Sequence, residues 1–534
     1  MFGKVKKVVL FAGFAFLLTV LVYLPSVRYD FITYDDLVYV LQNEHMHQGL
    51  TWQDVQWAFT SRTYASNWHP LTWLSMMADV SLGQGKRLSP EAWMQTGNCI
   101  SKIMHAHNVL LHATNAALLF VVAFLLCKGR LDEKWLLVFV LLWSLHPLRT
   151  EVVCWASERK EVLCVFFMLL SILSYLKNRF WTSLGCCILA MLAKPVAVTL
   201  PVVLFAYDFA ICGRRRLGRM VPFFLASAIT SLMTIGAQTV AIDCGTAQGS
   251  ASRLNSMFGA PIVYLRQTFW PAGLSAVYAA KSSPDWILIG LGIILVTILT
   301  LVVRTWFRKR FLGNGKETEI LDILVFAIAW VYIGLTPMLG IVKVGWQEHS
   351  DRYTYWIGCG ACVGVTMLLA AKGVKWWRTL VAWVETIDGR PVDVHRAKNI
   401  VFISICCIVG GLAILTYQRM PVWSGPVPFL RDSIQKSWSL DFASVMSKTF
   451  RNYGPEYVNE AEYWLRQCAT KKPGAEADIV LAEFLIWKGA DGEAEMLLEG
   501  ALRTDPHQKA ANGLMKRLRD RKTGAGTTTP HPSD

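Results

Sequence analysis

The chain has 534 residues, of which 54% are hydrophobic and only 17% are charged, and its formal net charge is +15. Soluble domains carry about a quarter charged residues, and they lack repeated uninterrupted apolar runs of about 15–20 residues. Such runs recur here from Val8 to about Thr416, so we predict an all-α polytopic membrane protein. The basic residues stand in short clusters between these runs, which indicates membrane topology and argues against nucleic acid as a partner.

The apolar runs predict about eleven membrane-spanning helices, each near the ~20 residues needed to cross ~30 Å of hydrocarbon. Lysines precede the first run, Val8 to Leu24, in the manner of a signal sequence. No small-x-small cleavage site follows it, so we expect an uncleaved anchor. The predicted spans are 8–27, 107–127, 135–147, 162–176, 180–194, 196–211, 221–239, 286–303, 320–336, 353–371 and 399–417.

The loops between these spans alternate in charge. Five basic clusters fall on the same side as the N-terminal lysines, and the positive-inside rule places that side, with the N-terminus, in the cytoplasm. An odd number of spans puts the C-terminal part outside. The clusters are Lys128/Arg130/Lys134, Lys177/Arg179, Arg214/Arg215/Arg216/Arg219, Arg304/Arg308/Lys309/Arg310 and Lys372/Lys375/Arg378.

A short acidic turn, Phe31 to Asp36, opens a long first outer loop expected at 28–106. Adjacent aspartates just beyond a membrane anchor are candidates for catalysis, because an enzyme at the bilayer surface needs a carboxylate to deprotonate its acceptor. The alternative is a helix cap or a solvated loop. The same loop contains a polar and aromatic stretch, Asn67-Trp68-His69-Pro70-Leu71-Thr72-Trp73.

A second polar cluster lies between two predicted spans and contains Glu151, Glu158, Arg159, Lys160 and Glu161. Charges there are costly unless they face water, one another or a ligand. A phosphate group is the anionic ligand that suits Arg159 and Lys160. The alternative is anchoring of the helices by snorkelling side chains.

Two more cations stand at the edges of predicted spans. Lys194 joins two apolar runs with almost no loop, and its side chain lies at the interface or points into a cavity. Arg352 either pairs with Asp351 or Glu348, or binds a phosphate. Polar packing is favoured over a metal site for three histidines near one span, His105, His107 and His112.

Taken together, these segments resemble the bacterial tetratricopeptide-repeat membrane glycosyltransferases, which are similar to the eukaryotic transmembrane and tetratricopeptide-repeat protein O-mannosyltransferases. The resemblance covers about residues 28–370. Met76 stands where the family pattern has histidine, and Glu161 where it has aspartate. The matching segments are Thr33-Tyr34-Asp35-Asp36, Asn67 to Leu74, His146-Pro147-Leu148, Ser157-Glu158-Arg159-Lys160, Lys194-Pro195 with Val198 to Pro201, and Asp351 to Tyr355.

The resemblance implies a GT-C fold in which a polyprenyl-phosphate sugar is the donor and mannose passes, with inversion, to Ser or Thr of exported proteins. Asp36 is then the first candidate for general base and Asp35 the second. Fixed cations stabilise the departing phosphate: Arg159, Lys160, Arg352 and Lys194. Substrate contacts are expected from Asn67, His69, Glu151, Glu158 and Asp351. No residue pattern has a strong metal-ligand signature, so no metal or cofactor is expected.

The chain after the last span is predicted to form a second domain. Two segments related at a spacing of 33, Glu460 to Pro473 and Glu493 to Pro506, resemble the second helix of a tetratricopeptide unit. We therefore expect a transmembrane domain at 1–418, a small helical domain outside the membrane at 419–522, and a disordered tail at 523–534. The helical domain would present a protein or peptide acceptor; the alternative is a plain helical cap.

Two alternatives to this function remain open. One is a transferase or polymerase of the same fold that modifies glycans or lipids, and the other is a transporter or a non-enzymatic membrane scaffold. Internal repeats and ionisable residues near mid-membrane are typical of transporters, whereas the ionisable clusters here are expected at the outer edge of the membrane. The predicted location is the cytoplasmic (inner) membrane, with several spans and contacts to membrane lipid.

Overall fold

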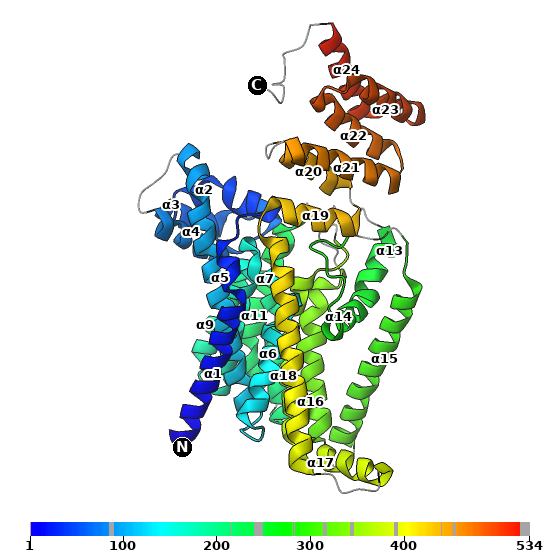
Figure 1. Cartoon of the computed structure of the whole chain (residues 1–534). Helices are drawn as coiled ribbons and strands as arrows, with labels where there is room; N and C mark the ends of the chain where they lie inside the picture. The colour runs from blue at the N-terminus through cyan, green and yellow to red at the C-terminus, as the bar shows by residue number, and fades with distance from the viewer. Residues whose placement is uncertain are drawn as a thin grey trace. The chain divides into compact units, whose positions relative to one another are not determined.

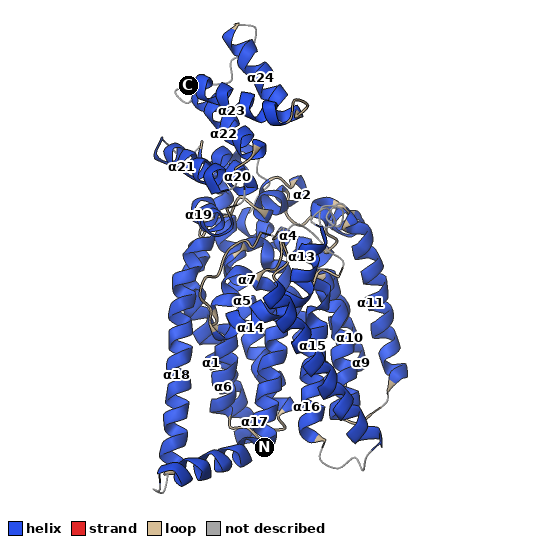
Figure 2. Cartoon of the chain, turned by 90° about the vertical axis from the view of Figure 1, so that its right-hand side faces the viewer, coloured by secondary structure: helices blue, strands red, loops and turns tan. Residues whose placement is uncertain are grey.

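The computed structural model describes residues 2–523, apart from 85–89, 215, 240–248, 280, 282, 313–317, 342–346, 389–392, 439, 452–454 and 472. Within these residues the chain is helical and has no strand (Figure 2). The tail expected to be disordered lies, from residue 524 on, outside the described residues. The chain divides into unit 1, Met1–Leu274 with Ala280–Ser424, and unit 2, Ser275–Ala279 with Gly425–Asp534.

Unit 1 confirms the prediction of an all-α polytopic membrane protein. In the described part of the chain, seven helices are long and apolar enough to cross a membrane, and a bent pair, Glu133–Ser144 with Pro147–Cys154, would make eight. The seven are Gly3–Arg28, Cys99–Leu126, Leu217–Ala237, Trp286–Leu312, Glu319–Met338, Asp351–Gly373 and Val394–Trp423.

The expected count of about eleven spans is thus higher than the structure supports by length and hydropathy. The other three predicted spans are helical but do not qualify by themselves. Helix α8 (Arg159–Leu176) begins with three charged residues, and the segments Phe180–Ala193 and Pro195–Ile211 are too short. These shorter helices pack around the region that holds the charged clusters.

The helices of unit 1 form a bundle (Figure 1). Their bounds are α1 (Phe2–Tyr23), α2 (Glu44–His47), α3 (Trp52–Thr60), α4 (Pro70–Gln84), α5 (Pro90–Leu126), α6 (Glu133–Ser144), α7 (Thr150–Cys154), α8 (Arg159–Leu176), α9 (Phe180–Ala193), α10 (Leu200–Ala206), α11 (Leu217–Ala237), α13 (Gly249–Leu254), α14 (Ala260–Phe269), α15 (Trp286–Phe307), α16 (Glu319–Ile328), α17 (Thr354–Asp388) and α18 (Val394–Arg419).

Close packing holds this bundle together, because lipid gives apolar helices no hydrophobic reason to associate. Helix α5 contacts α1, α6 and α8, and α8 contacts α9 along its length. Small residues allow the close approach. A side chain at Gly360 of α17 would meet the ring of Trp330 at 2.5 Å, and one at Gly364 would meet Ala327 at 2.8 Å.

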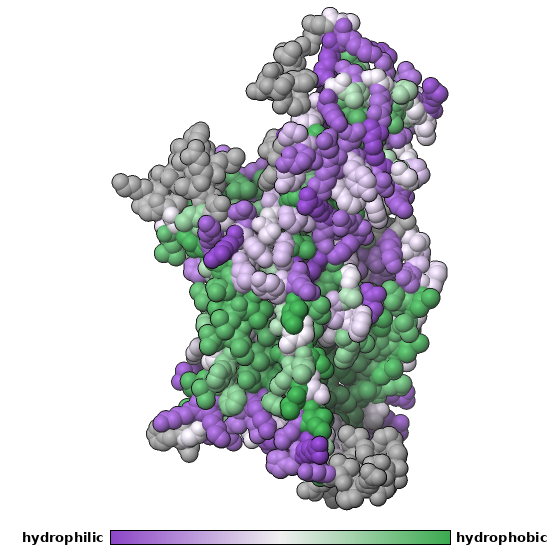
Figure 3. Space-filling view, in the orientation of Figure 1, coloured by the Kyte–Doolittle hydropathy of each residue, from purple (hydrophilic) through white to green (hydrophobic). Residues whose placement is uncertain are grey.

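The outer surface of the bundle is apolar, as a membrane protein requires. Figure 3 shows a green band of hydrophobic residues over α1, α18 and α15. Side chains that point outward from α15 include Ile287 and Ile294, which are 76% and 56% exposed. Such exposure would be unfavourable in water, and it is ordinary where lipid is the solvent.

The predicted basic clusters gather at one end of unit 1. Lys4 lies over the ring of Phe124 near the end of α5, and Arg130 forms a 2.8 Å ion pair with Glu319 at the start of α16. The acidic turn and the second polar cluster lie at the other end. Helix α17 connects the two, since Arg352 precedes it and Lys372 lies 20 residues further on, roughly 30 Å along a helix.

The first outer loop folds onto the bundle through a small core of its own. This core contains Tyr39, Trp73 and Met76, all of them buried. Helix α3 begins at a threonine cap, where the Thr51 side chain accepts a hydrogen bond from the backbone N–H of Asp54. Met76, which replaces the histidine of the family pattern, is fully buried among apolar side chains.

Unit 2 consists of helices that pack in sequence. They are α19 (Pro426–Ser437), α20 (Leu440–Phe450), α21 (Pro455–Lys471), α22 (Ala475–Lys488), α23 (Asp491–Thr504) and α24 (Lys509–Lys522). The spacing of 33 relates α21 to α23: the buried residues Ala461, Leu465 and Cys468 of α21 correspond to buried Ala494, Leu498 and Ala501 of α23.

Candidate active site

Four breaks in helical structure bring the charged residues of unit 1 together. Asp35 and Asp36 precede a single turn of π-helix, Leu37–Leu41. Trp155 is extended (φ −102°, ψ 119°) and separates α7 from the short turn Ala156–Glu158, after which α8 begins. Lys194 is extended at the end of α9, and Arg352 lies in the turn Asp351–Tyr353 that precedes α17. The charged side chains therefore stand at the ends of helices, where they can approach one another without passing through the apolar core of the bundle.

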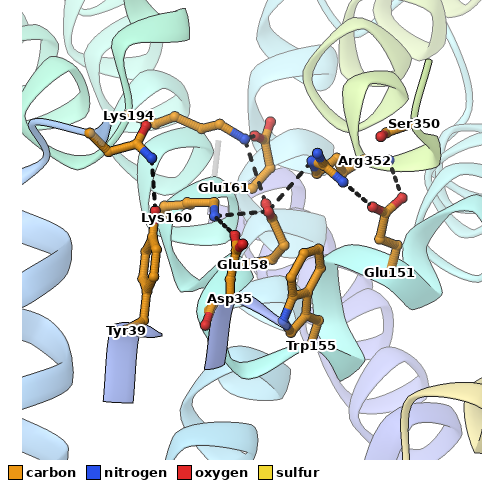
Figure 4. A network of polar contacts seen from close by, with 12 residues as sticks. Asp35, Tyr39, Glu151, Trp155, Glu158, Lys160, Glu161, Lys194, Ser350 and Arg352 are labelled. Atoms are coloured by element: carbon orange, nitrogen blue, oxygen red, sulfur yellow. Dashed lines mark hydrogen bonds and ion pairs between the residues drawn. The ribbon is translucent and has the colours of Figure 1, made fainter. Parts of the chain in front are cut away.

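Glu158 lies at the centre of the resulting ion-pair cluster (Figure 4). Its carboxylate oxygens are 3.2 Å from Lys160 Nζ, 3.5 Å from Lys194 Nζ and 3.6 Å from Arg352 Nε. The side chain is completely buried. Burial by itself would raise the pKa of this carboxyl, but the three cations outweigh burial and lower the pKa to about 2. Glu158 is therefore an anion at neutral pH.

Each cation also contacts a second carboxylate (Figure 4). Lys160 Nζ is 3.0 Å from Asp35 Oδ2, and Lys194 pairs with Glu161. Glu158 and Glu161 are three residues apart at the start of α8, so their side chains lie on the same side of the helix. The cluster thus has Asp35, Glu158 and Glu161 around two lysines.

Arg352 joins this cluster from the far side through Glu151. Its guanidinium pairs with Glu151 Oε1, and its backbone N–H donates to Oε2 at 2.8 Å. The side chain of Arg352 is 14% exposed, whereas that of Glu151 is only 1% exposed. In all, four carboxylates (Asp35, Glu151, Glu158 and Glu161) surround three cations, for a formal charge of −1.

Aromatic rings form one wall of the cluster. Lys160 Nζ lies 4.7 Å from the ring centroid of Tyr39, and both Lys160 and Arg352 lie 5.6 Å from the ring of Trp155. Trp155 is itself stacked on Trp423. Rings in these positions stabilise buried cations and hold them in place.

The two adjacent aspartates have different environments. Asp36 is buried, and both of its carboxylate oxygens accept hydrogen bonds: Oδ1 from the backbone N–H (2.9 Å) and hydroxyl of Ser157, and Oδ2 from the N–H of Ile32 (3.0 Å). Burial raises the pKa of Asp36 to about 6, although these hydrogen bonds oppose the shift. Asp35 is 32% exposed and is the most accessible carboxylate of the cluster.

Arg159, the first of the predicted phosphate ligands, belongs to a separate network. Its guanidinium is 1% exposed and donates to Asp79 (2.7 Å), Asn108 (2.6 Å), Ser75 (2.9 Å) and the carbonyl of Met104 (2.8 Å). These partners come from α4 and α5 and leave the guanidinium no open face. Of the four predicted cations, the structure therefore brings Lys160, Lys194 and Arg352 together.

The predicted substrate residues separate in the same way. Glu151 and Glu158 are in the cluster. Asn67 reaches the cluster through Tyr39, to whose hydroxyl it donates a hydrogen bond at 3.1 Å. His69 packs between Tyr39 and Trp73, where burial first and then the lysines hold the pKa of His69 well below its ordinary value. Asp351 is buried at the start of the turn that contains Arg352.

The three histidines considered for metal binding are used for packing. His105 lies edge-on to the ring of Tyr29, and His107 pairs with Asp79. His112 bonds the Tyr355 hydroxyl (2.7 Å) and the Ser144 carbonyl (3.0 Å). No group of three or more His, Cys, Asp or Glu side chains within the described residues is arranged to hold a metal ion. Metal independence stays a prediction.

No family model matches the chain. Comparison with curated proteins finds human protein O-mannosyl-transferase TMTC4, which is 26% identical over 215 residues, or 35% of this chain and 27% of that protein. Human protein O-mannosyl-transferase TMTC3 is 24% identical over 191 residues, or 33% of this chain and 19% of that protein. The chain is similar to protein O-mannosyl-transferases. The similarity spans about a quarter or less of the length of each relative.

This similarity agrees with the resemblance drawn from the motifs at the level of protein O-mannosyl-transferases, while a bacterial origin and the GT-C fold stay predictions. The motifs assigned no role in the site to Tyr39, Trp155 and Glu161, although Glu161 belongs to the second polar cluster. Glu161 had a detectable signal, since it stands three residues after Glu158 at a helix start. Tyr39 and Trp155 had none, because aromatic residues are common at membrane interfaces.

Proposed function

We propose that this protein is a membrane glycosyltransferase that transfers mannose from a polyprenyl-phosphate donor to Ser or Thr hydroxyls of exported proteins. The observation that carries the proposal is the cluster at the start of α8, in which an accessible carboxylate, Asp35, contacts a cation, Lys160, at 3.0 Å. The similarity to human protein O-mannosyl-transferases supports the reaction class.

In the proposed reaction the acceptor oxygen attacks C1 of the sugar, and the bond between C1 and the phosphate oxygen breaks with inversion. Asp35 takes the proton of the acceptor hydroxyl, and polyprenyl phosphate leaves. Lys160, Arg352 and Lys194 stabilise the leaving phosphate, with no proton needed there. The leaving phosphate gains one negative charge as Asp35 loses one, so the net charge of the cluster with its substrate stays constant.

Asp35 rather than Asp36 is the proposed base, which reverses the order expected from the sequence. A general base must reach the proton that it accepts, and the oxygens of Asp36 already accept hydrogen bonds from Ile32 and Ser157. Asp36 is instead proposed to hold the acidic turn against the start of α8. Arg159 is proposed to hold α8 against α4 and α5, without contact to the donor.

The remaining expectations belong to the same proposal. Glu151, Glu158 and Glu161 hold the cations in place until the donor phosphate competes for them. The site opens outside the cytoplasmic membrane, unit 2 presents the protein acceptor, and no cofactor takes part beyond the lipid-linked donor. Each of these statements depends on the transfer reaction itself.

The test is sugar transfer from polyprenyl-phosphate mannose to a Ser/Thr peptide in proteoliposomes, comparing wild type with Asp35→Asn, Asp36→Asn and Glu44→Gln. Glu44 is an exposed carboxylate in the same outer loop and serves as the control. Asp35→Asn is expected to reduce transfer at least about a hundredfold, within the range of general-base catalysis. Thermal unfolding of each variant is measured alongside, so that a loss of transfer is separated from a loss of stability, and Glu44→Gln should transfer normally.

Two results would contradict the proposal. If Asp35→Asn transfers as well as Glu44→Gln does, Asp35 is not the base. If wild type transfers no sugar from this donor to peptide, but elongates a glycan or a lipid-linked sugar, the acceptor is wrong while the reaction class stands.

A further inference from the structure

A cavity of about 700 Å³ lies at the end of unit 1 opposite the ion-pair cluster. It is formed by the end of α5 and the turn after it, the start of α16, and α17 around residues 367–375. Lys372 lies roughly 30 Å along α17 from Arg352, so the cavity is separate from the proposed active site. Its volume is in the range of small-molecule sites.

The walls of this cavity have two characters. The apolar lining includes Ala371 and the buried side chains of Ile323 and Met367. The basic lining consists of Lys128 and Lys375, which are exposed, and Lys372, which is half-buried. An amphiphile fits such a division, with its polar group among the lysines and its chain along the apolar side chains. A soluble anion would leave the apolar wall uncovered.

The charges at the cavity favour an anionic polar group. Its two carboxylates are engaged: Glu319 pairs with Arg130 at 2.8 Å, and Asp322 accepts from Trp306 Nε1 at 2.7 Å and from Thr318. Lys128, Lys372 and Lys375, in contrast, form no ion pair with any described residue. Three lysines that have no ion-pair partner among the described residues attract a negative charge to this cavity.

We propose that this cavity binds an anionic membrane phospholipid, with the phosphate headgroup at the three lysines and an acyl chain along Ile323, Met367 and Ala371. The observations favour a lipid over a free phosphate because apolar side chains line the same cavity as the lysines. The inference does not depend on the transfer reaction, since no residue of the ion-pair cluster takes part.

The proposal is tested by native mass spectrometry of the full chain in neutral detergent, titrated with dioleoyl phosphatidylglycerol or dioleoyl phosphatidylcholine. These lipids have the same chains and differ in net charge. Wild type is expected to bind phosphatidylglycerol at least about tenfold more tightly. The variant Lys128→Gln/Lys372→Gln/Lys375→Gln should lose that preference, because the three lysines supply the positive charge that attracts the anionic headgroup.

Two further variants separate a built site from general charge. Lys177→Gln/Arg179→Gln removes two exposed cations that do not line the cavity, and should keep wild-type binding. Ala371→Trp fills the apolar wall without changing charge, and should weaken phosphatidylglycerol binding about tenfold. Thermal unfolding of each variant is measured alongside, so that a variant that fails to fold is recognised, and the other variants then decide.

The proposal is overturned by any of three results. The first is that the control pair Lys177→Gln/Arg179→Gln reduces binding as much as the lysine triple does, which would mean a diffuse electrostatic effect. The second is that millimolar glycerol 3-phosphate displaces the lipid from wild type, which would mean a site for a soluble phosphate. The third is that wild type shows no preference for phosphatidylglycerol over phosphatidylcholine.

Discussion

Each unit of the molecule contains a glutamate that contacts more than one cation, and the two glutamates are in very different surroundings. Glu158 of unit 1 is completely buried, and its partners Lys160, Lys194 and Arg352 are 10–15% exposed. Glu462 of unit 2 pairs with Arg466 and Lys488, which are 40% and 37% exposed. The same residue types therefore form a buried cluster in one unit and a surface network in the other.

The difference in burial decides what each network does. Exposed ion pairs contribute about 0–1 kcal/mol, because water already solvates both partners. A buried cluster requires every charge to be compensated, and removing one partner costs about 3–5 kcal/mol. A protein gains little stability from keeping such a cluster, which agrees with the role in binding a charged substrate that is proposed for it.

The largest effect is expected for Glu158→Gln, which removes the central negative charge and leaves three buried cations with fewer partners. The free energy of unfolding should fall by about 3–5 kcal/mol. SDS-induced unfolding in mixed micelles measures this change. The matched surface substitution, Glu462→Gln in unit 2, should cost less than about 1 kcal/mol. Equal costs would show that burial does not distinguish the two networks.

A smaller, pH-dependent effect is expected at Asp36. Its folded-state pKa of about 6 is raised above the ordinary value of 3.8 for this carboxyl, so the folded state binds the proton more tightly than the unfolded state does. The stabilisation from this proton is fully present below about pH 4 and is lost as the pH rises through about 6. A pKa difference of about two units corresponds to about 3 kcal/mol in the free energy of unfolding.

This prediction is checked by comparing the unfolding of wild type and Asp36→Asn from pH 7 to pH 4.5. The stability of wild type relative to the variant should increase as the pH falls. Glu158 does not obscure the result. Its pKa is lowered to about 2, so its effect on stability changes with pH only below about pH 4.5. A constant difference across this range would mean that Asp36 keeps an ordinary pKa in the folded protein.

The smallest effect is expected in unit 2. Arg466 pairs with Glu462 of its own helix and with Glu493 of α23, at 2.8 and 2.6 Å. Arg466→Gln should lower the unfolding free energy by less than about 1 kcal/mol, and 0.5 M salt should remove most of that difference. A loss above about 2 kcal/mol, unaffected by salt, would place this pair with the buried networks.

The ion-pair cluster shows how far sequence reasoning reaches into the site. Lys160, Lys194 and Arg352 are predictable as members of one site because each stands where an apolar run begins or ends. Arg159 is adjacent to Lys160 and has the same charge, but consecutive helical residues point about 100° apart. One side chain therefore faces Asp79 and Asn108, and the other faces Asp35.

The sequence by itself determined the class of the protein, because long apolar runs leave a chain no stable arrangement other than helices across a membrane. It also determined that the charged motifs collect at one end of the bundle, since every span reverses the chain direction. Only the tertiary structure decided which aspartate is accessible and which arginine is enclosed. Those outcomes depend on contacts such as Ser157 with Asp36, 121 residues apart, and no local pattern fixes them.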